Sequence, residues 1–160
     1  MGQVRFFSDP HFGHENMAKN RGYPSAEMMN EHIITLWNMY VHKKDTVWIL
    51  GDITMEKDGY EILDRLLGYK KIVLGNHDKP QHVSKLLKYV NSVCGVKSYR
   101  EAWLTHIPIH PIEMRKRKFN IHGHVHSSDI PDPRYYNVSF DAIEYPRTYE
   151  EIYETIKQRV

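Results

Sequence analysis

The stretch KIVLGNHD, from Lys71 to Asp78, decides the fold that the rest of the chain is expected to adopt. Its apolar part, Ile72–Leu74, predicts a short buried strand, and Gly75 ends that strand directly before polar residues. The same pattern occurs twice earlier in the chain, where the apolar runs VRFFS and TVWIL are followed by DPH and GD. In open α/β sheets, sites are built at the carboxyl ends of strands. The three stretches therefore predict a sheet with a polar site along one edge.

Helices and further strands are predicted around these three strands. Ser25 is placed to cap a long helix, and Thr148 and Glu151 stand at capping-box spacing before a closing helix. The predicted helices are residues 25–43, Tyr60–Leu67, Gln81–Tyr89 and Thr148–Gln158. The predicted strands are Val4–Ser8, Thr46–Leu50, Ile72–Leu74, Tyr99–Leu104 within a mostly extended region from Ser92 to Ile121, and Tyr135–Phe140. Early βαβ units followed by later strands favour a layered α/β fold.

Length and composition indicate one soluble domain over residues 1–160. The formal net charge of +2 argues against tight binding of duplex nucleic acid. The N-terminal residues lack the apolar core of a secretory signal, and no run approaches 18 apolar residues, so we expect a cytoplasmic protein (host cytoplasm if phage-encoded) with no membrane partner. The single cysteine, Cys94, excludes an intramolecular disulfide and a thiolate-rich zinc site. The sequence leaves the oligomeric state open, a homo-oligomer included.

The polar residues after the strands form a coherent set of metal ligands. The set contains two carboxylates, one amide and four imidazoles: Asp9, His11, Asp52, Asn76, His106, His124 and His126. Mixed oxygen and nitrogen donors suit Mn, Fe, Zn or Co. Seven ligands are too many for one catalytic ion, which needs an open position, but they suit two ions that share a bridging carboxylate about 3.5–4 Å apart. Glycine before Asp52, Asn76 and His124 is expected to let the chain turn sharply and approach an ion closely.

The order of these residues resembles a known superfamily. The five blocks D-x-H, GD, GNHD, H and G-H-x-H occur in that order between Asp9 and His126, as in the calcineurin-like metallophosphoesterases. The stretches SDPHFGHENM, LWN and YYNVSFDAIEYPRTYEEI resemble a compact bacterial and phage subgroup of that superfamily. The resemblance implies an αββα sandwich of two mixed β-sheets flanked by helices. It also implies two divalent metal ions as cofactors, Mn being favoured and Fe, Zn, Ni or Co being alternatives.

The resemblance also implies a role for each residue. Asp9, His11 and His126 would hold the first ion, and Asn76, His106 and His124 the second. Asp52 would bridge the two ions. In the implied reaction, a hydroxide that bridges the metals attacks phosphorus.

The catalytic residues implied by the resemblance are His77 and Asp78. His77 would protonate the departing oxygen or stabilise its charge, and Asp78 would orient His77. A positioned general acid is worth about 10²–10⁴ in rate.

Several other polar residues are candidates for lesser roles. His14, Arg21 and Arg134 are candidate substrate contacts. His122 alternates with two of the ligands, so on a strand it would face the same side. The basic run RKRK at 115–118 is interpreted as a solvated hairpin, with an electrostatic lure for phosphate as the alternative.

The predicted function is hydrolysis of phosphodiesters or of small phosphorylated metabolites and nucleotides. A Ser/Thr protein phosphatase is the first alternative, but that class has V-D-R-G after GD and has GNHE, whereas this chain has ITME after Asp52 and has GNHD. A non-catalytic metal-binding scaffold is a further alternative, although His77 and all seven ligands are retained. A DNA-repair nuclease would need a capping domain for which this chain has no room.

Overall fold

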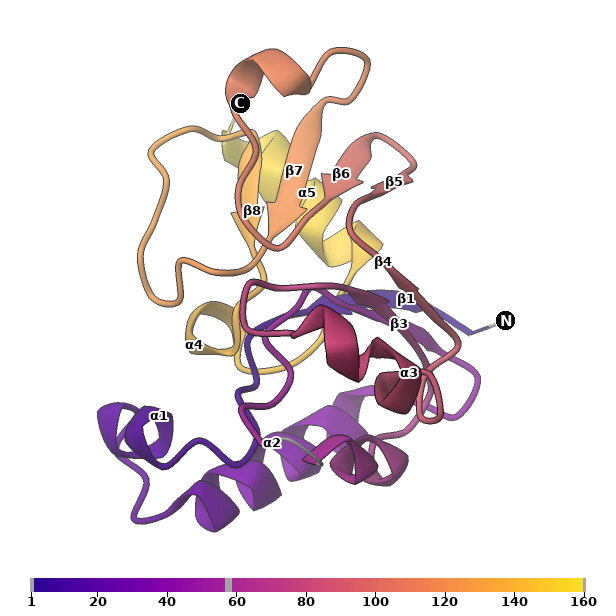
Figure 1. Cartoon of the computed structure of the whole chain (residues 1–160). Helices are drawn as coiled ribbons and strands as arrows, with labels where there is room; N and C mark the ends of the chain where they lie inside the picture. Colours follow the sequence, from indigo (N-terminus) through magenta and orange to yellow (C-terminus); the bar gives the residue numbers. More distant parts are fainter. Residues whose placement is uncertain (1, 57–58, 160) are drawn as a thin grey trace.

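The computed structural model describes residues 2–56 and 59–159, which form two mixed β-sheets packed face to face (Figure 1). The five-stranded sheet has the order β4-β3-β2-β1-β9, and the four-stranded sheet has the order β5-β6-β7-β8. The strands of the first sheet are β1 Val4–Phe7, β2 Thr46–Ile49, β3 Tyr69–Val73, β4 Ser92–Cys94 and β9 Arg147–Thr148. Those of the second are β5 Lys97–Tyr99, β6 Ala102–Leu104, β7 Phe119–His122 and β8 Tyr135–Asn137.

Helices cover the two sheets from outside, as Figure 1 shows. The α-helices are α1 Glu15–Asn20, α2 Ala26–Tyr40, α3 Val83–Leu86, α4 Phe140–Ile143 and α5 Tyr149–Arg159. The described residues also form three 3₁₀ helices: η1 Gly59–Arg65, η2 Pro80–His82 and η3 Pro111–Glu113. α2 and α3 lie against the five-stranded sheet, whereas α5 lies beside the four-stranded sheet. The predicted αββα sandwich is therefore confirmed.

Strand β1 shows how one sequence pattern serves two interfaces. Neighbouring side chains of a strand point to opposite faces of its sheet. Phe7 packs edge-on against Trp37 of α2, with ring centroids 5.5 Å apart, whereas Phe6 packs against Tyr99 of β5 at 5.6 Å. All four residues belong to or pack against one core cluster. The central strand thus joins the helix layer to the second sheet.

The parallel strands bring distant polar residues to one edge of the molecule. β1 to β4 run parallel, and β6 to β8 run parallel in the other sheet. The loops that follow their carboxyl ends meet between the sheets, because Nδ1 of His106 lies 2.7 Å from the carbonyl oxygen of Leu50, and the N–H of His124 donates to Asp9 at 2.9 Å. The predicted polar edge is therefore built from both sheets.

Two predicted helix starts are confirmed. The hydroxyl of Ser25 accepts from the N–H of Met28 at 3.2 Å, and α2 begins at the next residue. Before α5, Thr148 and Glu151 form the reciprocal bonds of a capping box.

Other element boundaries differ from the predictions. The segment Tyr99–Leu104 is a tight hairpin rather than one strand, because Arg100 has φ of +47° and the chain reverses there. The predicted helix at 60–67 is the 3₁₀ helix η1, and Gln81–Tyr89 contains only one α-helical turn after η2. The predicted strand Tyr135–Phe140 ends at Asn137, because Phe140 already begins α4.

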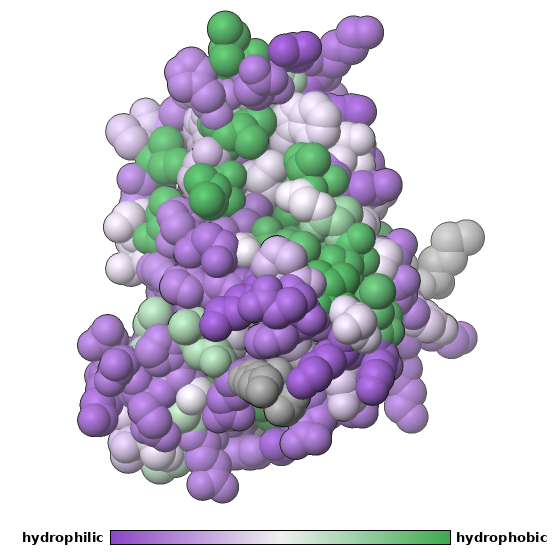
Figure 2. All heavy atoms as spheres, in the orientation of Figure 1, coloured by the Kyte–Doolittle hydropathy of each residue, from purple (hydrophilic) through white to green (hydrophobic). Residues whose placement is uncertain are grey.

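The surface is mixed in polarity. Figure 2 shows hydrophilic residues over the region of α1 and α2, and apolar side chains gathered near the edge strand β4. Exposed apolar residues near this strand include Leu87 and Val96. No helix in the described part of the chain is long and apolar enough to cross a membrane.

Candidate metal centre

Two groups of candidate metal ligands lie where the sheets meet. Within each group, the ligand atoms all lie within 4.8 Å of one another. The first group is Asp9, His11 and His126, and the second is Asp52, His106 and His124. In each group, the carboxylate follows a strand of the five-stranded sheet and at least one histidine follows a strand of the four-stranded sheet. A metal ion bound by either group would therefore be held by both sheets.

Asp52 lies between the two groups. Its Oδ2 atom is 3.7 Å from Nε2 of His11 and 3.4 Å from Nε2 of His106. The amide oxygen of Asn76 is 2.8 Å from the same nitrogen of His106. One carboxylate oxygen is thus close to histidines of both groups, and the Asn76 oxygen joins the second group. This is the arrangement that a bridging Asp52 requires.

Three buried ligand atoms have no hydrogen-bond partner among the described residues. They are Oδ1 of Asp9 and both ring nitrogens of His11. A buried polar atom without a partner costs about 1–3 kcal/mol, so such atoms call for an explanation. Burial lowers the pKa of His11 to about 4, in spite of the raising effect of Asp9 and Asp52. The imidazole is therefore neutral at pH 7, which is its metal-binding form, and the unpartnered donors fit a divalent cation.

The ligand residues carry an unusual share of left-handed backbone. Eight described non-glycine residues have positive φ, and five of them belong to the candidate ligand set: Asp9, His11, Asp52, His124 and His126. Such conformations cost about 1–3 kcal/mol each and cluster at functional sites. The backbone is therefore bent at the residues that would touch the ions.

The glycines before the ligands allow close approach, as expected. A Cβ on Gly75 would lie 2.2 Å from Oδ1 of Asp52, and one on Gly123 would lie 2.4 Å from Oδ2 of Asp9. Of the three glycines, only Gly51 also has a positive φ, at +94°. Sharp turning is thus supplied mainly by the ligands themselves, and the expectation that glycine would supply it is wrong at Gly75 and Gly123.

Two residues that the sequence did not single out hold the ligands in place. Oδ2 of Asp141 lies 2.9 Å from Nδ1 of His126, which leaves Nε2 of that ring free for an ion. The hydroxyl of Ser139 donates to Oδ2 of Asp9 at 2.9 Å. Both residues follow β8 at its carboxyl end, and this position in NVSFDA is the sequence signal that could have identified them.

Arg21 supports this arrangement and is not free to contact a substrate. It makes two hydrogen bonds to the carboxylate of Asp141, at 2.8 and 2.7 Å, and also donates to the carbonyl oxygens of Asp9 and Pro10. Its side chain is only 6% exposed. Burial acts to raise the pKa of Asp141, but hydrogen bonds from His126 and Arg21 outweigh it and hold the pKa well below its usual range. The prediction of a substrate contact at Arg21 is therefore corrected to an internal ion pair.

His77 lies beside the centre and is open to solvent. Its side chain is 46% exposed, and Nε2 is 4.0 Å from Oδ2 of Asp52. Its backbone N–H donates to Oδ1 of the same aspartate at 3.0 Å. A substrate could thus reach this ring, as the predicted catalytic role requires.

Asp78 has a different role from the predicted one. Its carboxylate is buried and accepts backbone N–H groups from Asp52, Ile53 and Gly75 at 2.8–3.1 Å. Burial raises the pKa of Asp78 against these hydrogen bonds. Asp78 therefore fixes the loop after β2 to the loop after β3. Among the described residues, its carboxylate makes no hydrogen bond to the His77 ring, so the expectation that it orients this ring is wrong.

The remaining candidates are divided between positions near and far from the centre. His14 caps α1 by accepting from the N–H of Met17, and its ring lies 6.0 Å from that of His11. Arg134 pairs with Asp132 at 2.6 Å, and its backbone bonds Asn120 near the amino end of β7, so the structure does not bring it to the centre.

His122 and the basic run also lie outside the ligand groups. His122 is buried at the end of β7 with Nδ1 2.9 Å from the carbonyl oxygen of Gly123. The predicted alternation is wrong because His124 and His126 lie beyond the strand in left-handed backbone. In the basic run, Arg115 pairs with Glu113 and Lys118 with Glu101, and the run is solvated as expected. The predicted hairpin is wrong, because the run lies in the connection between the parallel strands β6 and β7.

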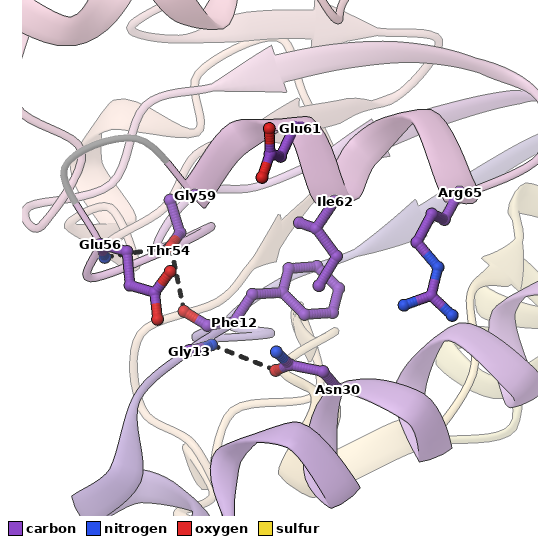
Figure 3. A pocket seen from close by; sticks show the side chains of 9 residues that line it. All are labelled: Phe12, Gly13, Asn30, Thr54, Glu56, Gly59, Glu61, Ile62 and Arg65. Carbon is purple, nitrogen blue, oxygen red and sulfur yellow. Dashed lines mark hydrogen bonds between the residues drawn. The ribbon is translucent and has the colours of Figure 1, made fainter.

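A cavity of about 480 Å³ adjoins the ligand loops and is shown in Figure 3. Its floor contains Phe12, which directly follows His11, and its rim includes Thr54 and Glu56. The hydroxyl of Thr54 donates to the carbonyl oxygen of Phe12 at 3.0 Å, which ties the loop after β2 to the loop after β1. This contact keeps the two ligand-bearing loops together.

The fold and the centre define an α/β protein with two mixed sheets and candidate metal ligands at their common edge. No family model matches the chain. The chain is 31% identical over 158 residues to the uncharacterized protein MJ1445 of Methanocaldococcus jannaschii, with 91% of this chain and 85% of that protein covered. It is 30% identical over 179 residues to the gene 66 protein of Mycobacterium phage D29, with 89% of each covered. The chain belongs to the family of these proteins.

Two solved structures share the fold. The protein of unknown function AQ665 from Aquifex aeolicus has a TM-score of 0.76 and 24% identity, covering 96% of this chain and 99% of its own. A structure described as a novel archaeal phosphodiesterase has a TM-score of 0.51 and 19% identity, covering 84% of this chain and 82% of its own. At these identities the likeness concerns the fold.

Proposed function

We propose that this protein is a dinuclear-metal-dependent phosphoesterase of the calcineurin-like superfamily, in its compact bacterial and phage subgroup. Its substrates would be phosphodiesters or small phosphorylated metabolites and nucleotides. The observation that carries the proposal is the position of Asp52 Oδ2, 3.7 Å from Nε2 of His11 and 3.4 Å from Nε2 of His106, between the two candidate ligand groups. The fold shared with an archaeal phosphodiesterase agrees with this proposal.

Each candidate ligand would have a defined role in binding the two ions. When bound, two divalent ions, Mn²⁺ being favoured, lower the pKa of a water molecule and stabilise charge on phosphate oxygens. Asp9, His11 and His126 would hold one ion, and Asn76, His106 and His124 the other. Asp52 would supply one oxygen that serves both.

His77 would act on the leaving group. It is the exposed member of the GNHD block, and its backbone N–H fixes it beside Asp52. A protonated imidazole at this position can donate from a ring nitrogen to the departing oxygen.

Metal-dependent turnover tests the proposal. The purified protein would be stripped with EDTA, reloaded with Mn²⁺ or Ni²⁺, and assayed on p-nitrophenyl phosphate, bis-p-nitrophenyl phosphate and cyclic nucleotides. We expect turnover only after reloading, and two metal peaks on either side of Asp52 in a crystal of the loaded protein. A single occupied site at saturating metal, or no turnover on any ester, would contradict the proposal.

A second experiment tests His77. Proton donation matters most when the departing oxygen is basic, so His77→Ala should lose most of the roughly 10²–10⁴ acid contribution on an alkyl ester and much less on a nitrophenyl ester of the same phosphate. Metal content should be unchanged. His42→Ala, which alters an exposed histidine before β2, is the matched control. Equal losses on both esters would mean that His77 does not protonate the leaving group.

A further inference from the structure

A second cavity, of about 360 Å³, opens directly beside His77. Its lining residues are Thr54, Met55, Glu56, Asn76, His77, Lys79 and His82. Two of these, Asn76 and His77, also belong to the candidate centre. In the proposed function, the group that leaves lies next to the residue that protonates it. This cavity is therefore the space available to the leaving group.

One wall of the cavity is a fixed turn that carries a cation. Asp78 ties this turn to the protein through three backbone N–H groups, and the N–H of His82 donates to the carbonyl oxygen of Lys79 at 2.9 Å. Pro80 further restricts the backbone between them. Lys79 and His82 thus extend from one rigid segment, with His77 on the same segment.

The positive charge on this wall is not neutralised within the described structure. The side chain of Lys79 is exposed, and its ammonium group makes no hydrogen bond or ion pair with any residue in 2–56 or 59–159. The acidic residue in the lining, Glu56, turns its carboxylate toward Phe12 and Gly13 in the neighbouring cavity, as Figure 3 shows. A Cβ on Gly13 would lie 2.3 Å from its Oε1. Among the described residues, the cavity beside His77 therefore offers an ammonium group that has no ionic partner.

The only rings among the described lining residues of this cavity are the imidazoles of His77 and His82. No Phe, Tyr or Trp is among its described residues. Stacking of a base on an aromatic side chain is worth about 1–3 kcal/mol, and no Phe, Tyr or Trp in the described lining can supply it. The Lys79 ammonium group instead favours a negatively charged leaving group in this cavity.

We propose that this cavity binds the leaving group, and that the leaving group of the natural substrate carries a second anion, a carboxylate or a phosphate, which pairs with Lys79. The inference rests on the proposed function and narrows its substrate class to doubly anionic esters. His82, on the same turn, would contribute a ring N–H donor to the same anion.

Three substrates test this inference. They share the same phosphate group and differ only in the aryl leaving group, which is phenyl, 4-(carboxymethyl)phenyl or 4-(phosphonomethyl)phenyl. We expect the metal-loaded wild type to prefer an anionic ester about two- to fivefold in kcat/KM, mainly through KM, as for one solvent-exposed charge pair. The two anionic esters distinguish carboxylate from phosphate recognition. Lys79→Met should abolish the preference, and Lys79→Arg should retain it. Lys43→Met, at an exposed lysine before β2, is the matched control.

The outcomes separate the inference from the function on which it rests. Equal kcat/KM values for all three esters, or a preference that survives in Lys79→Met, would overturn the inference and leave the proposed function standing. Absence of turnover on every ester by the metal-loaded wild type would overturn both.

Discussion

The orientation of His126 depends on two residues that lie far from each other in the sequence. Asp141 accepts from its ring, and Arg21 holds that carboxylate with two hydrogen bonds. The same guanidinium donates to the carbonyl oxygen of Asp9. One partly buried ion pair thus positions candidate ligands that come from both sheets.

Asp141→Asn should therefore weaken metal binding. Removing a carboxylate that orients a ligating histidine typically costs 10–100-fold in metal affinity or activity. Titration of the stripped protein with Mn²⁺ would measure the affinity directly. Asp132→Asn removes an ion-paired aspartate far from the centre and is the control. Equal Mn²⁺ affinity in wild type and Asp141→Asn would show that the ion pair does not act on the ligands.

Asp52→Asn should harm activity more than His126→Ala. Asp52 is close to both ligand groups and supplies a negative charge, whereas His126 belongs to one group and is neutral when it binds a metal. Metal analysis should find weaker binding of both ions in Asp52→Asn and weaker binding of mainly one ion in His126→Ala. An Asp52→Asn protein that keeps two ions and near-full turnover would disprove the bridging role.

The sequence predicted that the candidate ligands would lie together because each follows a strand at its carboxyl end. It could not predict the partners of Arg21 or Asp78, because both depend on contacts between distant segments. Arg21 reaches a carboxylate 120 residues away, and Asp78 binds backbone N–H groups 25 and 26 residues before it. Such pairings depend on the folded arrangement of loops, which carries no local signal.

Elements with a chemical signal at their ends were predicted best. α2 begins after Ser25 and α5 after Thr148, where capping side chains satisfy free N–H groups. The hairpin between β5 and β6 was missed because its turn contains no glycine, proline or asparagine, and Arg100 takes the left-handed conformation instead. Capping residues therefore predicted where these helices begin. The turn between β5 and β6 was not predicted, because Arg100 is not a residue type typical of turns.

The capping box of α5 should give a pH-dependent contribution to stability. Burial acts to raise the pKa of Glu151, but hydrogen bonds from Thr148 and the charge of Arg147 outweigh it and lower the pKa. A carboxylate with a lowered folded pKa stabilises the protein above its unfolded pKa, and this contribution is lost as the pH falls through the folded value. Gln can still form the capping box, so Glu151→Gln removes mainly the charge and should reduce the free energy of unfolding by about 0.3–1 kcal/mol at pH 7.

Urea unfolding at pH 7 and near pH 3.5 would measure this effect. The difference between wild type and Glu151→Gln should shrink at the lower pH. Glu154→Gln, which alters an exposed pair with Lys157, should change stability less at pH 7. A difference that stays constant over this pH range would argue against the charge-assisted cap.

At the scale of the whole molecule, the candidate centre joins the two sheets. Asp9 and Asp52 come from the five-stranded sheet, whereas His106, His124 and His126 come from the four-stranded sheet. The sequence predicted this layered architecture from the order of its strands and helices. It did not predict which sheet supplies each ligand, because strand order within a sheet is set by tertiary packing.

Metal removal should therefore lower the stability of the whole fold. A ligand at 100 times its Kd adds about 2.7 kcal/mol to the free energy of unfolding, which is about 5–11 °C in Tm for a domain of this size. Thermal unfolding with saturating Mn²⁺ and with EDTA would measure the shift. Asp52→Asn should show a smaller shift than wild type. An identical Tm with and without metal would mean that the ions do not hold the sheets together.

The left-handed backbone at five of the candidate ligands has a consequence for how such a sequence evolves. Histidine pays a steric penalty in this conformation that Asn and Gly largely avoid. At His124 and His126, a change to Asn would relieve local strain while it removes a candidate metal ligand. Random variants selected only for resistance to heat without metal should therefore accumulate such changes and lose the centre. Retention of aspartate and histidine at these positions in natural sequences would reflect selection for what the centre does, acting against selection for the stability of the empty fold.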